Sequence, residues 1–127
     1  MPARTALLIS CSKEDARMVR ERSKGERRPI NSYVLNILMR SVEFQENLYE
    51  RLERFSLSKD ALTTTTFLSP GPRTVFLLRC SVQDARRIRR IAKWRAQTIS
   101  GFVVTMLRRS WNASESIEMG LRDTVRR

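Results

Sequence analysis

The sequence predicts a mainly α-helical protein made of two β-α-α repeats, in which two strands form one antiparallel ribbon and four helices pack on it. Three observations predict this fold. The 127-residue chain matches itself at an offset of 69 positions. Each copy begins with an apolar run of strand length, and two segments with the apolar spacing of helices follow each run. We therefore expect a unit at 1–54, a linker at 55–72 and a unit at 73–127, with one core shared by both units.

The internal repeat is the strongest of these observations. Residues 4–12 read RTALLISCS, and residues 73–81 read RTVFLLRCS. The match continues without a gap, and about a third of roughly 50 paired positions are identical. Two copies are too few for a stable solenoid, so the repeat favours two units related by a pseudo-twofold axis.

Each unit opens with a strand and a capped helix. We expect strands at Thr5–Cys11 and Thr74–Cys80, because these apolar and β-branched runs have strand length. Ser12 and Ser81 are suitable N-caps for the helices that follow. The first helix of each unit is expected to bury one stripe of side chains, namely Ala16, Val19 and Ser23 in the first unit and Ala85, Ile88, Ile91 and Ala92 in the second.

A second helix follows in each unit after a break near 25–29 and near 96–97. Pro29 suits a first helical position and Thr98 suits an N-cap. We expect these helices to run from about residue 30 to 54, and from about residue 99 to 111 or beyond. Their apolar stripes are Ile30, Val34, Ile37, Leu38 and Val42, and Ile99, Val103, Met106, Leu107 and Trp111.

One strand followed by two helices leaves the backbone groups of the strand without partners. Antiparallel pairing of the two strands satisfies these groups and places both units in a single domain. The same pairing puts Cys11 and Cys80 at opposite ends of the ribbon, too far apart for a disulfide. We expect both cysteines to be buried core residues.

The charge indicates a polyanionic partner. The chain carries 25 Lys+Arg and 13 Asp+Glu, a formal net charge of +12. Residues 1–72 hold 12 basic and 9 acidic side chains, net +3, whereas residues 73–127 hold 13 basic and 4 acidic, net +9. Nucleic acid and an anionic membrane surface both fit such an excess. The charge says nothing about the fold.

The sequence lacks the residues that several other classes of function require. The chain has no histidine and only two cysteines, which excludes the common zinc patterns and histidine-based catalysis. We therefore expect no enzyme activity, no metal and no cofactor. No apolar run is long enough to span a membrane, and the apolar stretch before Cys11 is too short for a signal core. Together with the scarce cysteines, this predicts a cytoplasmic protein that does not bind membranes.

Residues 28–34, RPINSYV, resemble the start of the second helix in the ribbon-helix-helix family of repressors, and residues 97–103, QTISGFV, resemble it more loosely. The resemblance covers nearly the whole chain twice, and single-chain tandem members exist in this family. It implies an intramolecular ribbon-helix-helix pseudo-dimer that binds double-stranded DNA. In that family the ribbon lies in the major groove, and the N-termini of the second helices bind flanking phosphates.

The resemblance and the alternation of strand side chains together assign the contacts. Arg79 is the best base reader, as a bidentate partner of guanine, and its neighbours on the face contact base edges or thymine methyls. The base-contact face is Ala6, Leu8, Ser10, Val75, Leu77 and Arg79. The phosphate contacts are Arg4, Arg73, Arg28, Asn31, Ser32, Thr98, Ser100, Arg86, Arg87 and Arg90.

Each assignment has a plainer alternative. Ordinary helix capping explains Thr98 equally well, and the cations of 86–95 fit a solvated helix face. The outer face of the ribbon departs from the family because most of it is apolar. An exposed apolar face usually marks a partner, so the alternative function is a protein-interaction module that binds another protein or a second copy through this face.

Overall fold

The computed structural model describes residues 3–55 and 71–126, with side chains for 3–55 and 71–113. The elements in chain order are β1 (Arg4–Ser12), α1 (Lys13–Gly25), α2 (Ile30–Arg54), β2 (Arg73–Ser81), α3 (Val82–Trp94) and α4 (Ile99–Arg126). The predicted mainly α-helical fold with one two-stranded antiparallel sheet is therefore confirmed. Most of the expected linker at 55–72 lies outside the described residues.

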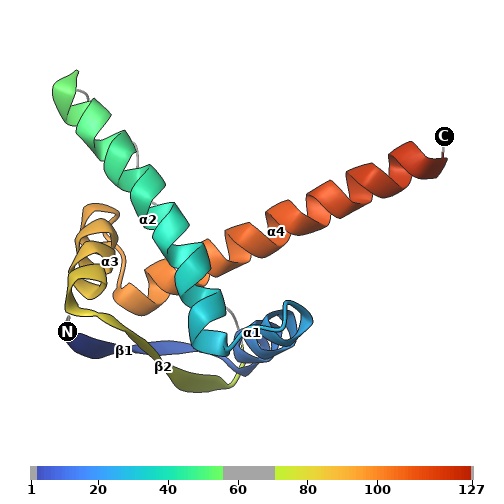
Figure 1. Ribbon diagram of the computed structural model, residues 1–127, viewed down its shortest axis with the longest axis horizontal. Coiled ribbons are helices and arrows are strands. Elements are labelled where there is room, and N and C mark those ends of the chain that lie inside the picture. Colours follow the sequence, from blue (N-terminus) through green and yellow to red (C-terminus); the bar gives the residue numbers. More distant parts are fainter. Residues whose placement is uncertain (1–2, 56–70, 127) are drawn as a thin grey trace.

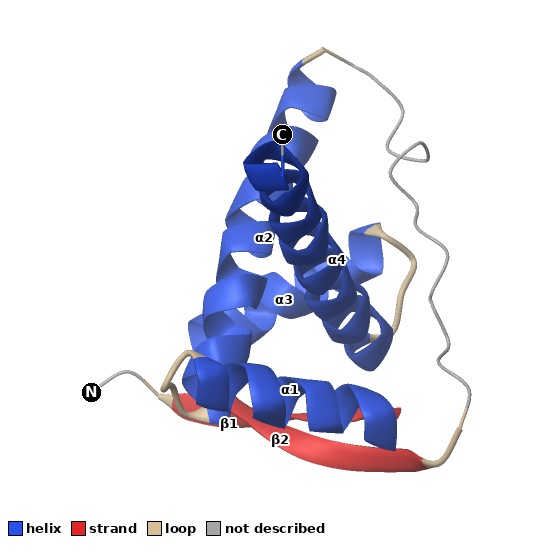
Figure 2. Cartoon of the chain, turned by 90° about the vertical axis from the view of Figure 1, so that its right-hand side faces the viewer, coloured by secondary structure: helices blue, strands red, loops and turns tan. Residues whose placement is uncertain are grey.

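The two strands pair along their whole length. Their register runs from Arg4 opposite Ser81 to Ser12 opposite Arg73. All four helices lie on one side of this ribbon (Figure 2). Helices α2 and α4 cross above it, with α1 and α3 to either side (Figure 1). One face of the ribbon therefore packs on the helices, and the other face is left without a covering element among the described residues.

Side chains of the strands alternate between the two faces as expected. The inner positions are buried, namely Leu7, Ile9, Cys11, Leu78 and Cys80, and half-buried Phe76 packs against the same core. One hydrophobic cluster joins Leu7, Ile9, Leu78 and Cys80 to buried side chains from all four helices, and Cys11 packs with Ala16 and Val104 in a second, smaller cluster. Burying this apolar surface is the main driving force that holds the helices on the ribbon.

The first helix of each unit starts and packs as predicted. The hydroxyl of Ser12 accepts a hydrogen bond from the Asp15 N–H at 3.0 Å, and the hydroxyl of Ser81 accepts one from the Asp84 N–H at 3.0 Å. These caps satisfy donors that the first helical turn leaves without partners. All seven residues expected in the buried stripes are buried.

The second helices begin close to the expected residues, with one correction. Helix α2 begins at Ile30 with Pro29 as its N-cap, so the prediction that Pro29 occupies the first helical position is wrong by one residue. Thr98 caps α4, because its hydroxyl accepts a hydrogen bond from the Gly101 N–H at 3.0 Å. Ile30, expected in the stripe, is 39% exposed because the first turn of α2 lies at the edge of β2, outside the core.

The two cysteines lie at opposite ends of the ribbon. Cys11 is paired with Thr74 and Cys80 with Thr5. Both thiols are free and buried, which confirms the expectation that no disulfide joins them. Burial raises the pKa of each thiol above its ordinary value.

Candidate nucleic-acid interface

The outer face of the ribbon is exposed and largely apolar at its centre. Leu8 is 61% exposed, Val75 56% and Leu77 55%. Ala6 and Arg79 are also exposed, whereas Ser10 is half-buried. The six residues assigned to base contact from the sequence therefore share this face, and the strand backbone brings them together. Neither strand contains an acidic residue.

The strand register sets the layout of this face. Leu8 lies opposite Leu77 at the centre, Ala6 opposite Arg79 on one side, and Ser10 opposite Val75 on the other. Directly opposite side chains on an antiparallel pair lie about 5 Å apart, so each of these pairs forms a contiguous patch. An apolar centre is thus flanked by arginine toward one end of the ribbon.

The arginines near the ribbon ends differ in their surroundings. Arg73 donates from Nη2 to the Ser10 carbonyl and hydroxyl, each at 3.3 Å, so its guanidinium is partly held against β1. Arg4 is exposed at the other end of the ribbon, opposite Ser81. The Arg79 guanidinium forms no hydrogen bond or ion pair with any residue that the structure describes. Of these three cations, Arg4 and Arg79 have exposed side chains that an external anion or a base edge can reach.

Side chains from the starts of α2 and α4 hold the two outer edges of the ribbon. Asn31 Nδ2 donates to the Arg79 carbonyl at 2.7 Å, and the Arg79 N–H donates to Asn31 Oδ1 at 2.6 Å. The Ser10 N–H donates to Ser100 Oγ at 2.8 Å. Edge strands need such partners because their backbone groups are otherwise exposed. Asn31 and Ser100, assigned from the sequence to phosphate contact, therefore bind the ribbon backbone with their side chains.

The helix N-termini consequently lie beside the ribbon. Helix α2 has no side-chain cap, and both Arg28 and Ser32 are exposed at its start. At the start of α4 the Thr98 hydroxyl already takes the Gly101 N–H. Free N–H groups and the helix dipole attract anions at such termini. The start of α2 is therefore the better anion site of the two.

Some basic residues in and directly after α3 are exposed, and others bind side chains of α2. Arg86 and Arg90 are exposed, as the phosphate assignment requires. Arg87 instead bonds Glu46 of α2, with Nη2 to Oε1 at 2.5 Å, and this hydrogen bond raises its pKa. Arg95, which follows the last residue of α3, is buried and donates from Nε to Gln45. On α1, by contrast, Arg17 is paired with both Glu14 and Glu21.

The structure also contains contacts that the sequence did not predict. Glu46 opposes Arg87 from another helix, and Arg108 of α4 pairs with buried Asp15 of α1 at 2.6 Å. The only signal for the ribbon-edge contacts was that small polar residues stand at the same place in both repeats. Asn31 and Ser100 are 69 positions apart, as are their partners Ser10 and Arg79.

In the described part of the chain, no group of three His, Cys, Asp or Glu side chains is placed to hold a metal ion. Of the helices within 3–55 and 71–126, none is long and apolar enough to cross a membrane. The exposed, acid-free ribbon face flanked by basic residues remains the feature best suited to a ligand.

Comparison with protein-family models, curated proteins and solved structures finds no match to this chain.

Proposed function

We propose that the protein binds double-stranded DNA as an intramolecular ribbon-helix-helix pseudo-dimer. The observation that carries the proposal is the outer face of the ribbon, which is exposed, free of acidic residues and bordered by arginine. A two-stranded ribbon fits the major groove of B-DNA, which is about 12 Å wide. The role in the cell would be that of a transcriptional regulator or an accessory factor in DNA transfer.

Three correspondences at the repeat offset support the pseudo-dimer. Leu8 and Leu77, which are 69 positions apart, lie opposite each other at the middle of the ribbon. Asn31 and Ser100 bind the backbone of residues that are themselves repeat equivalents. The two residues with positive φ in the interhelical loops, Arg27 and Ala96, also differ by 69. Antiparallel pairing about a central equivalent pair is the arrangement expected of two units related by a twofold axis.

The proposed contacts divide between bases and phosphates. Arg79 donates to the O6 and N7 atoms of a guanine, while Leu8 and Leu77 contact thymine methyl groups. The start of α2, with Arg28 and Ser32, binds a flanking phosphate. The exposed cations Arg4, Arg86 and Arg90 add sequence-independent attraction to the backbone.

The two half-sites should be unequal. The repeat equivalent of Arg79 is Ser10, which offers only a hydroxyl and is half-buried. One half of the ribbon thus carries a strong guanine reader and the other does not. A homodimer reads a palindrome, because both halves are identical. We expect this chain to prefer an asymmetric site in which one half contributes more specificity.

The test is fluorescence anisotropy of labelled duplexes across a salt series, with selected and random sequences side by side. Arg79→Ala is expected to weaken binding to the selected sequence by about tenfold or more, and to random DNA much less, because a bidentate base contact is worth about 1–3 kcal/mol. Arg51→Ala is the matched control. It removes the same charge from an exposed position near the far end of α2.

The salt series distinguishes the remaining outcomes. The logarithm of the binding constant should fall steeply with the logarithm of salt concentration, because bound Lys and Arg release counterions from DNA. Equal losses in Arg79→Ala and Arg51→Ala would remove the base-reading role. Absence of binding at low salt would overturn the DNA proposal.

The exposure of Leu8, Leu77 and Val75 favours a second candidate function. Three large apolar side chains, each more than half exposed on one face, are typical of a protein-interaction surface. If the ribbon binds a second copy of the chain, Leu8→Glu will convert an associated species to a monomer in sedimentation experiments. A wild-type protein that is monomeric at high concentration would exclude that self-association.

A further inference from the structure

An open cavity of about 400 Å³ forms a groove between α2 and α4. Ile37 and Phe44 line this groove from α2, and Met106 lines it from α4. Phe44 is 68% exposed, although a phenylalanine side chain gains free energy when it is removed from water. A groove with apolar side chains exposed along it favours an apolar occupant.

The apolar surface continues from the groove to the far end of α2. Four apolar residues recur at spacings of seven, four and seven positions, namely Ile37, Phe44, Leu48 and Phe55. These spacings place them on one stripe of the helix, about 27 Å long. Phe55, the C-cap residue, is 67% exposed, whereas Ile37 and Leu48 are half-buried. The stripe lies on a helix that projects away from the ribbon (Figure 1), and such a stripe is typical of a surface that packs on another helix.

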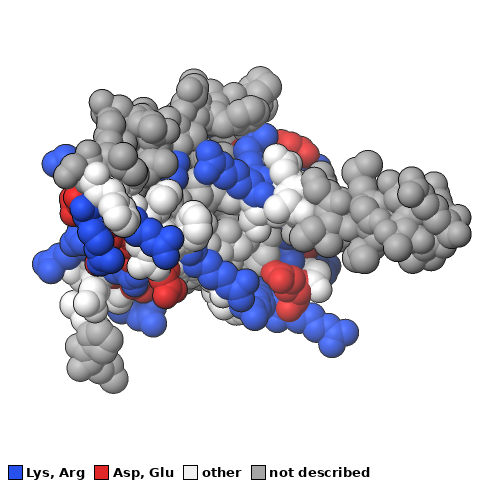
Figure 3. All heavy atoms as spheres, turned by 90° about the horizontal axis from the view of Figure 1, so that it is seen from above, with Lys and Arg blue, Asp and Glu red and all other residues white. Residues whose placement is uncertain are grey.

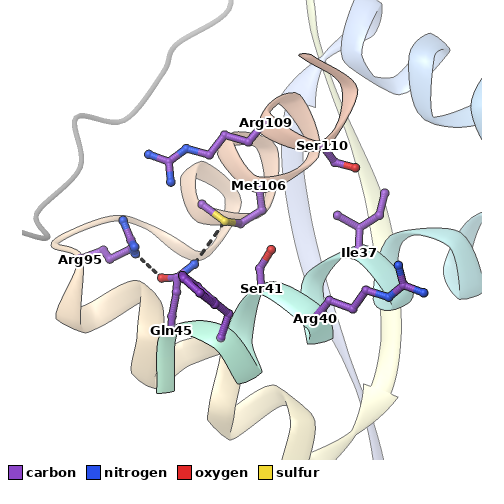
Figure 4. A pocket seen from close by; sticks show the side chains of 9 residues that line it. Ile37, Arg40, Ser41, Gln45, Arg95, Met106, Arg109 and Ser110 are labelled. Carbon is purple, nitrogen blue, oxygen red and sulfur yellow. Dashed lines mark hydrogen bonds between the residues drawn. The ribbon is translucent and has the colours of Figure 1, made fainter. Parts of the chain in front are cut away.

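Two polar side chains of the groove already have partners within the protein. Arg95 is only 6% exposed, and its Nε donates to the side-chain oxygen of Gln45. Gln45 donates from Nε2 to the sulfur of Met106 at 3.3 Å (Figure 4). An apolar side chain can therefore cover these groups without leaving the Gln45 amide unpaired.

Exposed arginines border the groove and the stripe. The side chains of Arg40 on α2 and Arg109 on α4 point away from each other, so they lie at opposite edges of the groove (Figure 4). Arg51, seven positions after Phe44, adds an exposed cation to the stripe itself. None of these three arginines forms an ion pair with a residue that the structure describes. Among the described residues, no acidic side chain lines the groove.

The acidic residues of the same part of α2 point in other directions. Glu46 is paired with Arg87 of α3. An α-helix turns by about 100° per residue, so Glu43 and Glu50 lie about 100° and 120° around α2 from Phe44. Viewed from the side opposite the ribbon, basic side chains also exceed acidic ones over the visible described surface (Figure 3). The charge beside the apolar stripe is therefore positive.

We propose that the groove and the α2 stripe bind an acidic amphipathic helix of another protein. The apolar face of that helix would pack on Ile37, Phe44, Leu48 and Phe55, in the way that amphipathic helices occupy apolar grooves. Acidic residues on either side of that face would lie near Arg40 and Arg109. Because these two arginines diverge, they suit two separate carboxylates on the flanks of a helix.

A second copy of this chain fits the surface less well. Pairing the stripe with its own equivalent would bring two surfaces with positive borders together, and like charges repel. An acidic helix replaces this repulsion with attraction. The proposal is also independent of DNA binding. Phe44 lies fourteen positions after the start of α2, about 21 Å along the helix from the ribbon edge, so the ribbon stays accessible.

The test is fluorescence anisotropy of three labelled synthetic peptides, each titrated with the full-length protein at physiological ionic strength. The first peptide has three heptads with leucine at positions a and d and glutamate at e and g. The second has lysine in place of glutamate, and the third contains the residues of the first in scrambled order. The first peptide is expected to bind one site per chain, and the other two at least tenfold more weakly, because one lacks the charge and the other the apolar face.

Phe44→Asp is expected to weaken binding of the acidic peptide by about tenfold or more, because it removes an apolar anchor and adds a like charge. Leu8→Asp is the matched control. It makes the same change in charge at an exposed apolar residue of the ribbon, and it should change the dissociation constant by less than about twofold. Circular dichroism would check that both variants fold.

A second pair of variants tests the charge. Arg109→Gln is expected to weaken binding of the acidic peptide by about threefold, whereas Arg89→Gln, at an exposed position of α3 outside the groove, should have less effect. Equal binding of the scrambled peptide, or equal weakening by Phe44→Asp and Leu8→Asp, would reduce the effect to net charge and overturn the proposal. So would absence of binding. Self-association of the wild type that Phe44→Asp abolishes in sedimentation experiments would assign the surface to a second copy instead.

Discussion

At the scale of single residues, Asn31 and Ser100 join the helices to the ribbon. Asn31 exchanges two hydrogen bonds with the Arg79 backbone, and Ser100 accepts one from the Ser10 N–H. We expect Asn31→Ala to lower the free energy of unfolding by about 1–2 kcal/mol, and Ser100→Ala by about 1 kcal/mol, since each lost hydrogen bond contributes about 0.5–1.5 kcal/mol. Urea denaturation measures both values.

Amide hydrogen exchange gives the local test of these contacts. Exchange of the Arg79 N–H should accelerate in Asn31→Ala only, and exchange of the Ser10 N–H in Ser100→Ala only. Asn47→Ala is the control, because Asn47 is exposed on the same helix as Asn31. If exchange accelerated equally at both ribbon edges in every variant, the two contacts would not act locally.

The raised pKa of the two buried cysteine thiols predicts that the stability of the protein depends on pH. Burial is the main cause that raises the pKa of Cys11 and Cys80 above the ordinary value of 9.0. The unfolded chain therefore releases these two protons at lower pH than the folded chain does. The folded state binds more protons in this range, so the free energy of unfolding falls as pH rises above about 9.

Urea denaturation at pH 8 and pH 10 measures this effect. The double variant Cys11→Ala, Cys80→Ala should lose less stability between the two pH values than the wild type does. Tyr33, whose pKa is also raised by burial, titrates in both proteins and so does not affect the comparison. The same loss in both proteins would mean that the thiols do not contribute.

At the scale of elements, the loops that follow α1 and α3 end these helices in the same way. Arg27 has a φ of 56° and Ala96 a φ of 55°. After α1, the Arg28 N–H donates to the Ser23 carbonyl and the Arg27 N–H to the Lys24 carbonyl. This is the Schellman pattern, in which glycine normally occupies the residue with positive φ.

Glycine at these positions should stabilise the protein. We expect Ala96→Gly to raise the free energy of unfolding by roughly 0.5–1 kcal/mol. A side chain at positive φ costs about 1–2 kcal/mol, and the greater conformational entropy that glycine loses on folding offsets part of this gain. Ala113→Gly, at an exposed position of α4, is the control, and it should lower stability by about 1 kcal/mol. Thermal denaturation compares the two, and a lower stability of Ala96→Gly would contradict the strain argument.

The ribbon is the element whose faces the sequence predicted best. Alternation along each strand assigned Leu7 and Ile9 to the core and Leu8 to the outer face, and the exposed fractions agree. The alternation is local, because successive side chains of any strand point to opposite sides. The outer-face residues of the candidate site could therefore be named without any knowledge of the helices.

At the scale of the whole molecule, contacts between the two repeats are specific. Buried Asp15 of the first repeat pairs with Arg108 of the second, whose repeat equivalent is Met39. Glu46 likewise pairs with Arg87 across the repeats. Self-association of the first repeat would place a methionine at the position of Arg108 and remove this ion pair, which is costly because Asp15 is buried. These pairs favour the association of unlike halves.

Separate expression of the two halves, divided within 56–70, tests this preference. Neither half should fold as a monomer, because each lacks a partner for its strand and half of the shared core. Equimolar mixing should give a 1:1 complex with greater resistance to urea than either half alone. Analytical ultracentrifugation and circular dichroism measure both effects. A half that folds as a stable monomer at micromolar concentration would contradict the expectation.

The sequence by itself determined the strands, the helices and most of their caps and buried stripes, because each of these depends on residues only a few positions apart. It also indicated that Cys11 and Cys80 lie far apart, because the repeat constrains the register of the ribbon. Strand alternation alone identified the residues of the outer face, and their expected role in base reading came from the family resemblance. Placing Pro29 one residue too far inside α2 was an error at a helix boundary, where local signals are weakest.

Only the tertiary structure decided which residues from distant parts of the chain meet. Arg87, assigned to phosphate from its place in a basic run, is paired with Glu46 on another helix. Asn31 reaches the Arg79 backbone, and Arg40 and Arg109 border one cavity. These partners are more than 40 positions apart in sequence. Their contacts depend on how helices cross above the ribbon, and helix crossing is set by the packing of whole surfaces rather than by any local pattern.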